Sequence, residues 1–312
     1  MATTMITGGT GFIGQHLARR LLAIGDKVVL FDLFPDANAI RDIATDVTLV
    51  HGDVSLLPDV LRAIKTHRVD RIAHCAYMIG AENEDNPPLA LRVNCLGNNN
   101  VFEAARLEEV ERVTWTSSVS LYGRSNGHDA VDEDDPCWPV RVYGMLKQFD
   151  ENLAEHYHRR FKVGHIAVRP SSVYGPGRLR GNLQYIQEWL KAAALGREVH
   201  IPGGDEMDNW SYVEDVAGAL FAGITASTLP ERRIFNIGGD YRSRREFGEY
   251  LMKILPGARV TIASGKEVLY RPRQINDNIA KHLGFTPQWS LERGVLATVN
   301  WYRSNAGLGA VG

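Results

Sequence analysis

The stretch Thr7-Gly8-Gly9-Thr10-Gly11-Phe12-Ile13-Gly14 decides the fold of this chain. A short apolar segment, Thr3–Thr7, leads into it, and leucines at helical spacing follow it, which predicts a strand, a glycine turn and a helix. Gly8 permits the tight turn, Gly11 lets the backbone approach a pyrophosphate, and Gly14 lets helix and strand pack closely. Because the helix N-terminus then faces the phosphates, the stretch predicts a dinucleotide-binding turn.

The next strand supplies the context that a lone glycine motif lacks. A strand is expected at residues 27–31, apolar from Val28 onward, and it ends at Asp32, 18 residues after Gly14. A carboxylate at this place can accept hydrogen bonds from the adenosine ribose hydroxyls and repels a 2′-phosphate, so NAD is preferred to NADP. The alternative is that Asp32 only starts the turn at Pro35.

The alternation of strand and helix then repeats along the first half. Strands are expected at residues 47–50, 70–74 and 112–116, and helices at 56–64 and 89–107. Such alternation predicts a parallel sheet with right-handed crossovers. Asp53 ends the third strand, where its carboxylate could reach an adenine amino group.

Bulk composition excludes several classes of function. The 312 residues are 44% hydrophobic and carry a net charge of −2, with no block of like charge that would suggest a nucleic-acid or membrane surface. No apolar run approaches the length of a membrane span, and the first residues lack a basic region, so we expect a cytoplasmic protein. Three widely spaced cysteines predict neither a disulfide framework nor a metal site.

Tyr143 and Lys147 are the candidate catalytic pair. They lie four residues apart in a helix expected at residues 140–161, so they share one face. A neighbouring ammonium should lower the pKa of the phenol from about 10 toward working pH, which suits proton exchange with a substrate hydroxyl. A Tyr-x-x-x-Lys pair also arises by chance in roughly one chain in every few, so it is weak evidence alone.

The motifs taken together carry a resemblance to a known family. Beside the glycine turn and Tyr143 with Lys147, they are the Asp53-Val54 pair, Asn94, residues 117–123 and residues 169–176. Their order and spacing resemble the extended short-chain dehydrogenase/reductase family, also called NAD-dependent epimerase/dehydratases. The resemblance implies an α/β fold: a doubly wound, parallel-sheet Rossmann domain at residues 1–170, joined by 212–238, and a smaller α/β substrate-binding domain at residues 171–211 and 239–312.

The resemblance also assigns roles to residues. Tyr143 is implied as the acid/base, Lys147 as the residue bonded to the nicotinamide ribose, and Ser118 as the hydroxyl that orients the substrate oxygen. The cofactor is NAD, and its expected contacts are Gly8, Gly11, Phe12, Ile13, Gly14, Asp32, Asp53, Val54, Ala76, Asn94, Tyr143, Lys147, Pro170 and Val173. The expected substrate pocket consists of Met78, Ser118, Ser120, Ser172, Asp208, Trp210 and Arg271.

Departures from the family pattern narrow the reaction. Sugar 4,6-dehydratases of this type resemble one another in an Asp-Glu pair after the catalytic hydroxyl residue, and decarboxylases keep a Glu at its second place. Here those positions are Val119 and Ser120, which cannot titrate, so both classes are disfavoured.

A second departure concerns the substrate diphosphate. Nucleotide-sugar enzymes of the family usually carry a clamping Arg where this chain has Asp208, and an Asn where it has Ser172. An Asp there should repel a diphosphate, although Arg271 keeps a basic residue at the family's second phosphate position. We therefore expect a substrate without a nucleotide diphosphate.

Three hypotheses remain. The favoured one is an NAD-dependent oxidoreductase that acts on a secondary hydroxyl of a small sugar, polyol, hydroxy acid or alcohol. The second is a nucleotide-sugar (UDP-hexose) 4-epimerase with tightly bound NAD. The third is a non-catalytic NAD-sensing protein. The helices at residues 89–107 and 140–161 are the family's usual dimer faces, which predicts a homodimer.

Overall fold

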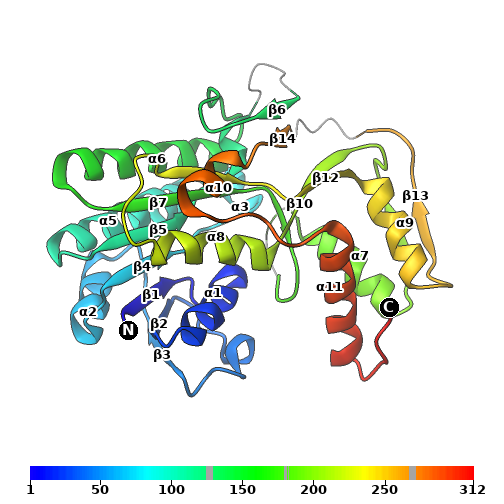
Figure 1. The fold of residues 1–312 in the computed structure, drawn as a ribbon, viewed down its shortest axis with the longest axis horizontal. Coiled ribbons are helices and arrows are strands. Elements are labelled where there is room, and N and C mark those ends of the chain that lie inside the picture. The colour runs from blue at the N-terminus through cyan, green and yellow to red at the C-terminus, as the bar shows by residue number, and fades with distance from the viewer. Residues whose placement is uncertain (124–128, 179–180, 182, 267–271) are drawn as a thin grey trace.

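The computed structural model describes residues 1–123, 129–178, 181, 183–266 and 272–312. Two parts lie side by side: a larger one built on a seven-stranded sheet, and a smaller one at the right of Figure 1 that holds the C-terminus. Arg271, one of the residues expected in the substrate pocket, lies outside the described residues.

The larger part is a doubly wound parallel sheet, which confirms the predicted fold class. Its strand order is β11-β7-β5-β4-β1-β2-β3, and each neighbouring pair is parallel. Thr7 at the end of β1 pairs with Phe31 and with His74, so the carboxyl ends of these strands meet at one edge. The strands are β1 (Thr3–Thr7), β2 (Lys27–Asp32), β3 (Val47–His51), β4 (Arg71–His74), β5 (Arg112–Thr116), β7 (His165–Pro170) and β11 (Ile234–Ile237).

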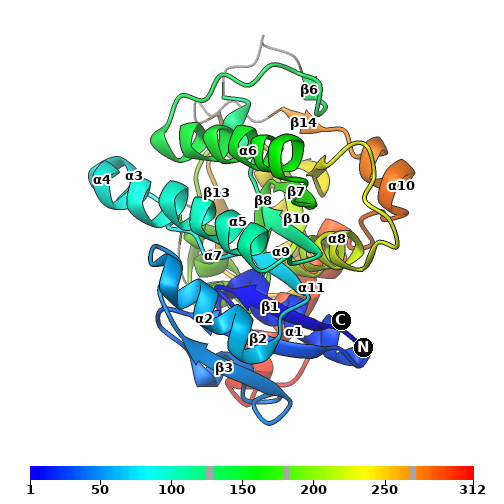
Figure 2. The same cartoon turned by 90° about the vertical axis from the view of Figure 1, so that its left-hand side faces the viewer.

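Helices cover both faces of this sheet (Figures 1 and 2), because its apolar strands are buried on both sides. One apolar core lies under α2 (Leu57–His67), α5 (Gly97–Leu107) and α6 (Val142–Phe161), and the other under α1 (Phe12–Ala23) and α8 (Val213–Thr225).

The helix expected at residues 89–107 is interrupted. It follows the short α3 (Glu82–Asp85) and runs through α4 (Pro87–Ala90), a π-helical segment η2 (Leu91–Leu96) and α5. A π-helical turn inside a helix is frequently found at functional sites.

The smaller part has its own core, formed around a three-stranded sheet of order β12-β10-β8. Its centre is aromatic: the ring of Trp210 stacks on Phe247 with centroids 4.7 Å apart. The elements are β8 (Ser172–Tyr174), α7 (Gln184–Ala194), β9 (Val199–Ile201), β10 (Met207–Tyr212), β12 (Asp240–Ser243), α9 (Arg244–Ile254), β13 (Val260–Ile262) and α11 (Leu291–Asn305).

The chain crosses between the two parts once more than the sequence suggests. α10 (Asp277–Leu283) buries Ile279 in the core under α1 and α8, although the sequence places residues 239–312 in the substrate domain. Just before it, β14 (Arg273–Gln274) pairs with β6 (Ala130–Val131), which returns the chain to the larger part. The remaining short elements are η1 (Ala37–Ile40) and η3 (Val119–Leu121).

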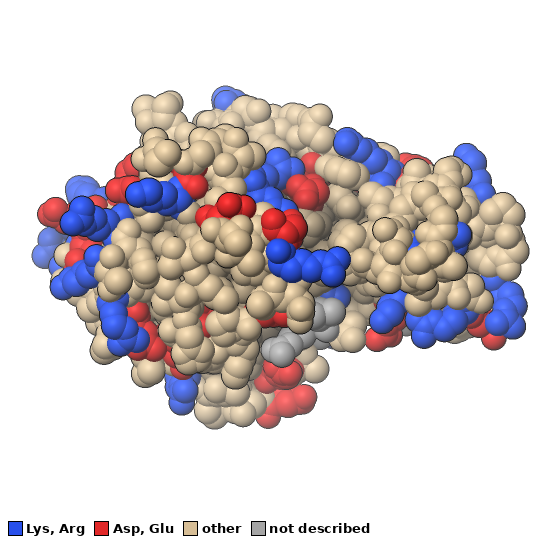
Figure 3. Space-filling model, turned by 90° about the horizontal axis from the view of Figure 1, so that it is seen from below, with Lys and Arg blue, Asp and Glu red and all other residues tan. Residues whose placement is uncertain are grey.

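The surface shows no single dominant charge in the view from below, where Lys and Arg side chains are interspersed with Asp and Glu (Figure 3). Among the described residues, no helix combines the length and the apolar character needed to cross a membrane.

Candidate active site

A cleft of about 2050 Å³ lies between the carboxyl edge of the large sheet and the smaller part. Its lining contains most of the residues that the sequence assigns to cofactor and substrate. They are Gly8, Gly11, Phe12, Ile13, Gly14, Asp32, Asp53, Val54, Ala76, Met78, Ser118, Ser120, Tyr143, Lys147, Pro170, Ser172 and Val173.

The glycine turn forms one end of the cleft and is shaped to receive a ligand. Gly8 has a φ of 64°, and a Cβ there would meet the backbone nitrogen of Ala76 at 2.8 Å. Gly11 precedes α1 and provides no side-chain cap, so N–H groups of the first helical turn are left for a ligand. This backbone cradle fits a dinucleotide pyrophosphate.

Two carboxylates line the same end, each fixed by nearby backbone. Oδ2 of Asp32 accepts hydrogen bonds from the Thr10 backbone nitrogen at 3.1 Å and from its hydroxyl at 2.9 Å. Oδ1 of Asp53 accepts one from the Ser55 nitrogen at 2.8 Å. Asp32 therefore sits at the end of β2 and beside the glycine turn, where it suits a ribose hydroxyl.

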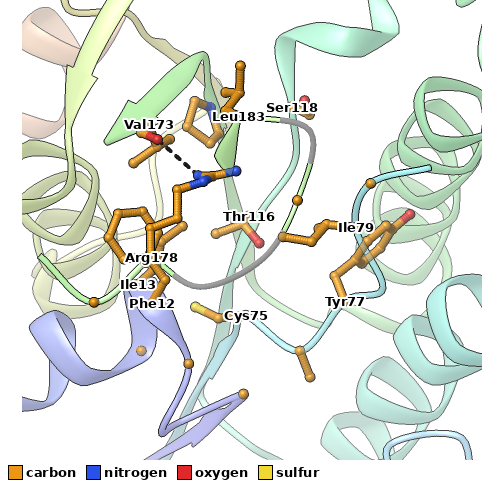
Figure 4. A pocket seen from close by; sticks show the side chains of 18 of the residues that line it. Phe12, Ile13, Cys75, Tyr77, Ile79, Thr116, Ser118, Val173, Arg178 and Leu183 are labelled. Carbon is orange, nitrogen blue, oxygen red and sulfur yellow. Dashed lines mark hydrogen bonds between the residues drawn. The ribbon is translucent and has the colours of Figure 1, made fainter. Parts of the chain in front are cut away.

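The catalytic candidates converge from two neighbouring elements. Ser118 follows β5 and caps η3, where its Oγ accepts a hydrogen bond from the Ser120 nitrogen at 3.1 Å. Tyr143 and Lys147 stand in the first turns of α6. Figure 4 shows Thr116 between the side chains of Phe12 and Tyr77, and Ser118 beyond it on the segment that follows β5.

A buried ion pair fixes α6 to the sheet below these residues. Arg169 on β7 donates to both oxygens of Glu151 on α6, at 2.9 Å from Nε and 2.7 Å from Nη2. The Ser117 hydroxyl donates to the same carboxylate at 2.5 Å. This two-point contact restricts α6 in rotation as well as in distance, and so fixes Tyr143 relative to Ser118.

The expected lowering of the Tyr143 pKa by Lys147 is wrong in this structure. Burial raises the pKa of Tyr143, while hydrogen bonding to Ser118 and the nearby Arg178 act against the rise. The Lys147 ammonium lies 5.9 Å from the centre of the Tyr143 ring, because it donates to the Thr116 carbonyl oxygen at 2.5 Å. Helical spacing places the two residues on one face but leaves the long lysine chain free to turn elsewhere.

Asp208 and Trp210 are not in the cleft, which corrects two expected pocket residues. Alternate residues of β10 point to opposite sides, and these two point into the core of the smaller part, each 0% exposed. The Asp208 carboxylate accepts from the Ser172 hydroxyl at 2.6 Å and lies 3.7 Å from Nε of Arg244. Asn209, between them, lines the cleft instead.

Asn94 also has a different place from the one expected. Its side chain, in the π-helical segment, is fully buried and does not line the cleft. Oδ1 accepts from the Met78 nitrogen at 2.7 Å, and Nδ2 donates to the Met78 oxygen at 3.1 Å and to Asn83 Oδ1 at 2.8 Å. Asn94 therefore holds the cleft loop at Met78 and is not itself part of the cleft lining.

Two functional candidates were missed from sequence. Arg178 reaches into the cleft above the Phe12 ring, 5.4 Å from its centre, and donates to the Val173 oxygen at 2.9 Å (Figure 4). Asp150 is fully buried on α6 and accepts from the Tyr77 hydroxyl at 2.9 Å. The signal for Asp150 was present, since it follows Lys147 by three residues and so shares its helical face.

Comparisons with known proteins show the family of this chain. The profile of the NAD dependent epimerase/dehydratase family matches residues 4–238. The chain belongs to this family. As a family member it is 28% identical to the UDP-glucose 4-epimerase of Mycolicibacterium smegmatis, over 97% of this chain and 99% of that protein. It is 27% identical to dTDP-glucose 4,6-dehydratase 1 of Escherichia coli, over 96% and 92%.

The fold and the cofactor agree with that membership. The crystal structure of Thermus thermophilus UDP-glucose 4-epimerase in complex with NAD superimposes with a TM-score of 0.85, at 25% identity and covering 96% of this chain and 99% of that one. NAD is the cofactor of this family member, as the sequence predicted. Among the described residues, no group of three or more potential ligands could hold a metal ion.

Proposed function

We propose that this protein is an NAD-dependent oxidoreductase that transfers hydride between NAD and a secondary hydroxyl of a small sugar, polyol, hydroxy acid or alcohol. The observation that carries the proposal is that Ser118, Tyr143 and Lys147 line the same cleft as the glycine turn. The bound cofactor supplies the hydride acceptor for the alcohol carbon.

The side chains divide the remaining chemistry. Tyr143, as phenolate, takes the proton of the substrate hydroxyl, and Ser118 donates a hydrogen bond to the same oxygen as it becomes a carbonyl. Arg178 helps to lower the Tyr143 pKa that burial raises, which favours the phenolate. Val119 and Ser120 carry no titratable group, so the elimination chemistry of a dehydratase lacks its acid and base here.

The wall of the smaller part favours a small substrate. Asp208 repels nothing in the cleft, because it is buried against Ser172 and Arg244. Neither Ser172 nor Asp208, which stand where the family pattern has an Asn and the clamping Arg, brings a cation to the cleft, and the residues of β8 and β10 that line it, Ser172 and Asn209, are uncharged. A diphosphate is usually held by guanidinium or ammonium groups.

Arg178 favours an acidic member of the small-substrate class. Its guanidinium lies inside the cleft, and burial lowers its pKa to about 10, so it stays protonated at neutral pH. A carboxylate next to the reacting hydroxyl would give this cation a partner, which ranks hydroxy acids first among the candidate substrates.

A UDP-hexose 4-epimerase is the second candidate. It is supported by the identity to UDP-glucose 4-epimerases over nearly the whole length of both proteins. An epimerase returns the hydride to the same sugar and keeps its cofactor, so it shows no net NADH. A non-catalytic NAD-binding protein would show neither reaction.

One panel of candidate substrates distinguishes the three proposed functions. The protein is mixed with NAD and with hydroxy acids, polyols, sugars and UDP-hexoses, and both NADH absorbance and hexose isomerisation are followed. Tyr143→Phe should lower kcat roughly 10²- to 10⁴-fold while NADH still binds, and Tyr250→Phe, on α9, is the matched control. Turnover that survives in Tyr143→Phe would contradict the proposal, and isomerisation without NADH would favour the epimerase.

We further propose a homodimer that uses α5 and α6. Large hydrophobic side chains are exposed along these helices and their N-terminal approaches: Leu89, Leu91, Leu96, Leu107, Val140, Met145, Phe149 and Phe161. Light scattering should give a dimer for the wild type and a monomer for Phe149→Glu. Met252→Glu, at an equally apolar exposed position on α9, should leave the dimer intact.

A further inference from the structure

Tyr77 contacts both catalytic side chains. It follows β4 in the wall of the cleft (Figure 4), and the Lys147 ammonium lies over its ring, 3.2 Å from the centroid. The Tyr143 ring meets it edge to face, with centroids 5.6 Å apart and planes at 90°. A cation over an aromatic face is attracted by the ring quadrupole, and more strongly where water is excluded. The ring of Tyr77 therefore helps to set where both catalytic groups lie.

Asp150 in turn holds Tyr77. The Tyr77 hydroxyl donates to Asp150 Oδ2 at 2.9 Å, and this carboxylate is 0% exposed. Asp150 lies on α6, one helical turn after Lys147, so the contacts close a ring from Lys147 to Tyr77 to Asp150 and back along the helix. The thiol of Cys95, from the π-helical segment, faces the same carboxylate.

We propose that Tyr77 and Asp150 are positioning residues that hold the Lys147 ammonium in the cofactor cleft, Tyr77 through its ring face and Asp150 as the buried counter-charge. The inference rests on the proposed function for its consequence in catalysis, but the geometry concerns cofactor binding, because Lys147 lines the cleft that receives NAD. Neither residue touches the substrate oxygen in this assignment, and both act through Lys147.

The charges of Lys147 and Asp150 predict a measurable pH dependence of cofactor binding. Burial lowers the pKa of Lys147 to about 8, and Asp150 is the main group that opposes the fall. Burial likewise raises the pKa of Asp150 to about 7, against the effect of Lys147 and of the Tyr77 hydroxyl. The other titratable groups that face Lys147 or Asp150 are His74, Cys75, Cys95, Tyr143 and Glu151.

The direction of the expected change in NADH binding follows from the charge of Lys147. Lys147 is protonated below its pKa and loses its charge as pH rises through about 8. Removing the Asp150 charge takes away the group that raises this pKa, so the lysine becomes neutral at a lower pH. Glu151 does not replace the lost charge, because it is paired with Arg169.

The test is the pH profile of NADH binding, measured by cofactor fluorescence from about pH 6 to about pH 9. The wild type should bind less tightly as pH rises through about 8. Asp150→Asn keeps the shape of the side chain and should move this alkaline limb down by roughly one pH unit, with about tenfold weaker binding between the two midpoints.

Two Tyr77 variants separate the roles of ring and hydroxyl. Tyr77→Phe keeps the ring face and should move the limb less than Asp150→Asn does, whereas Tyr77→Leu removes the ring and should weaken NADH binding at every pH. Thermal unfolding of each variant identifies any that fails to fold. If Asp150→Asn and Tyr77→Leu keep the wild-type profile and only unfold more easily, the pair is structural and the proposal is wrong.

This result is independent of the substrate. NADH binding is measured without any hydroxyl compound, so an unchanged profile rejects the positioning role alone. A shifted profile together with full turnover in Tyr143→Phe would instead keep the positioning role and reject the proposed catalytic function.

Discussion

The two walls of the cleft differ in what determines their shape. The cofactor wall consists of turns at the carboxyl ends of parallel strands, and its groups are backbone amides and short side chains such as Asp32. The opposite wall consists of one face of the strands β8 and β10. Side chains alternate between the two faces of a strand, so the register of the alternation decides which residues face the cleft. Backbone constraints can be recognised in the sequence, for example as glycines at fixed positions. Which face of a short strand points into the cleft cannot be recognised in this way.

The first prediction concerns the cofactor wall and has the largest expected effect. In Gly14→Ala, the new Cβ would meet the Gly9 backbone at 2.9 Å, and the Gly8 carbonyl oxygen more closely still. The turn must then shift, at a cost of about 1–3 kcal/mol in overpacking. We expect the affinity for NADH to fall roughly 100-fold, which corresponds to about 3 kcal/mol.

Fluorescence titration with NADH measures this effect. Gly309→Ala is the control, because an added Cβ there has open space around it. NADH binding by Gly14→Ala within a few-fold of the wild type would show that the turn tolerates a side chain, and that the two walls are equally adaptable.

The second prediction tests the placement of Asp208. Asp208→Ala removes a buried carboxylate that accepts from the Ser172 hydroxyl and lies 3.7 Å from Nε of Arg244, whose side chain is 1% exposed. The free energy of unfolding should fall by about 2–3 kcal/mol, since hydrogen bonds and ion pairs to a buried charged group are lost. Substrate KM should change little, because the carboxylate points into the core.

Urea unfolding and steady-state kinetics together test whether Asp208 stabilises the core or contacts the substrate. Asp205→Ala is the matched control, since Asp205 pairs with Arg245 at 2.9 Å on the surface nearby and should matter far less. A large change in KM with unchanged stability would place Asp208 in the cleft after all, as the sequence had suggested.

The fold was predictable because its determinants are local. The glycine turn, the apolar strands and Asp32 each follow from short stretches whose conformation few other sequences allow. The break of the helix at residues 91–96 was not predictable, since nothing in the apolar spacing there distinguishes a π-helical turn from an α-helical one.

The site was predictable in part, for the same reason. Residues at strand ends, such as Ser118, fall in the cleft because every carboxyl end of a parallel sheet does. Trp210 and Asp208 depend on which side of β10 faces the core, and that is set by packing against Phe247 and Arg244 far along the chain. The direction of the Lys147 ammonium depends on Tyr77, which also comes from a distant segment.

The third prediction has the smallest expected effect and concerns Asn94. It asks whether the Asn94 side chain contacts NAD or only holds neighbouring parts of the protein in place. The resemblance assigns Asn94 to NAD, whereas its three hydrogen bonds hold Met78 and Asn83. Asn94→Ala should therefore lower the free energy of unfolding by about 1–3 kcal/mol through the backbone groups left unpaired. Asn98→Ala on the same helical stretch is the matched control.

The control is informative because Asn98 is equally buried, yet its amide makes no hydrogen bond to the described residues. Its removal should leave stability unchanged or improve it, since a buried amide without a partner is unfavourable. If Asn94→Ala instead weakened NADH binding tenfold without changing the unfolding free energy, the framework role would be wrong. The effect on NADH binding should stay within a few-fold, because Asn94 itself does not line the cleft.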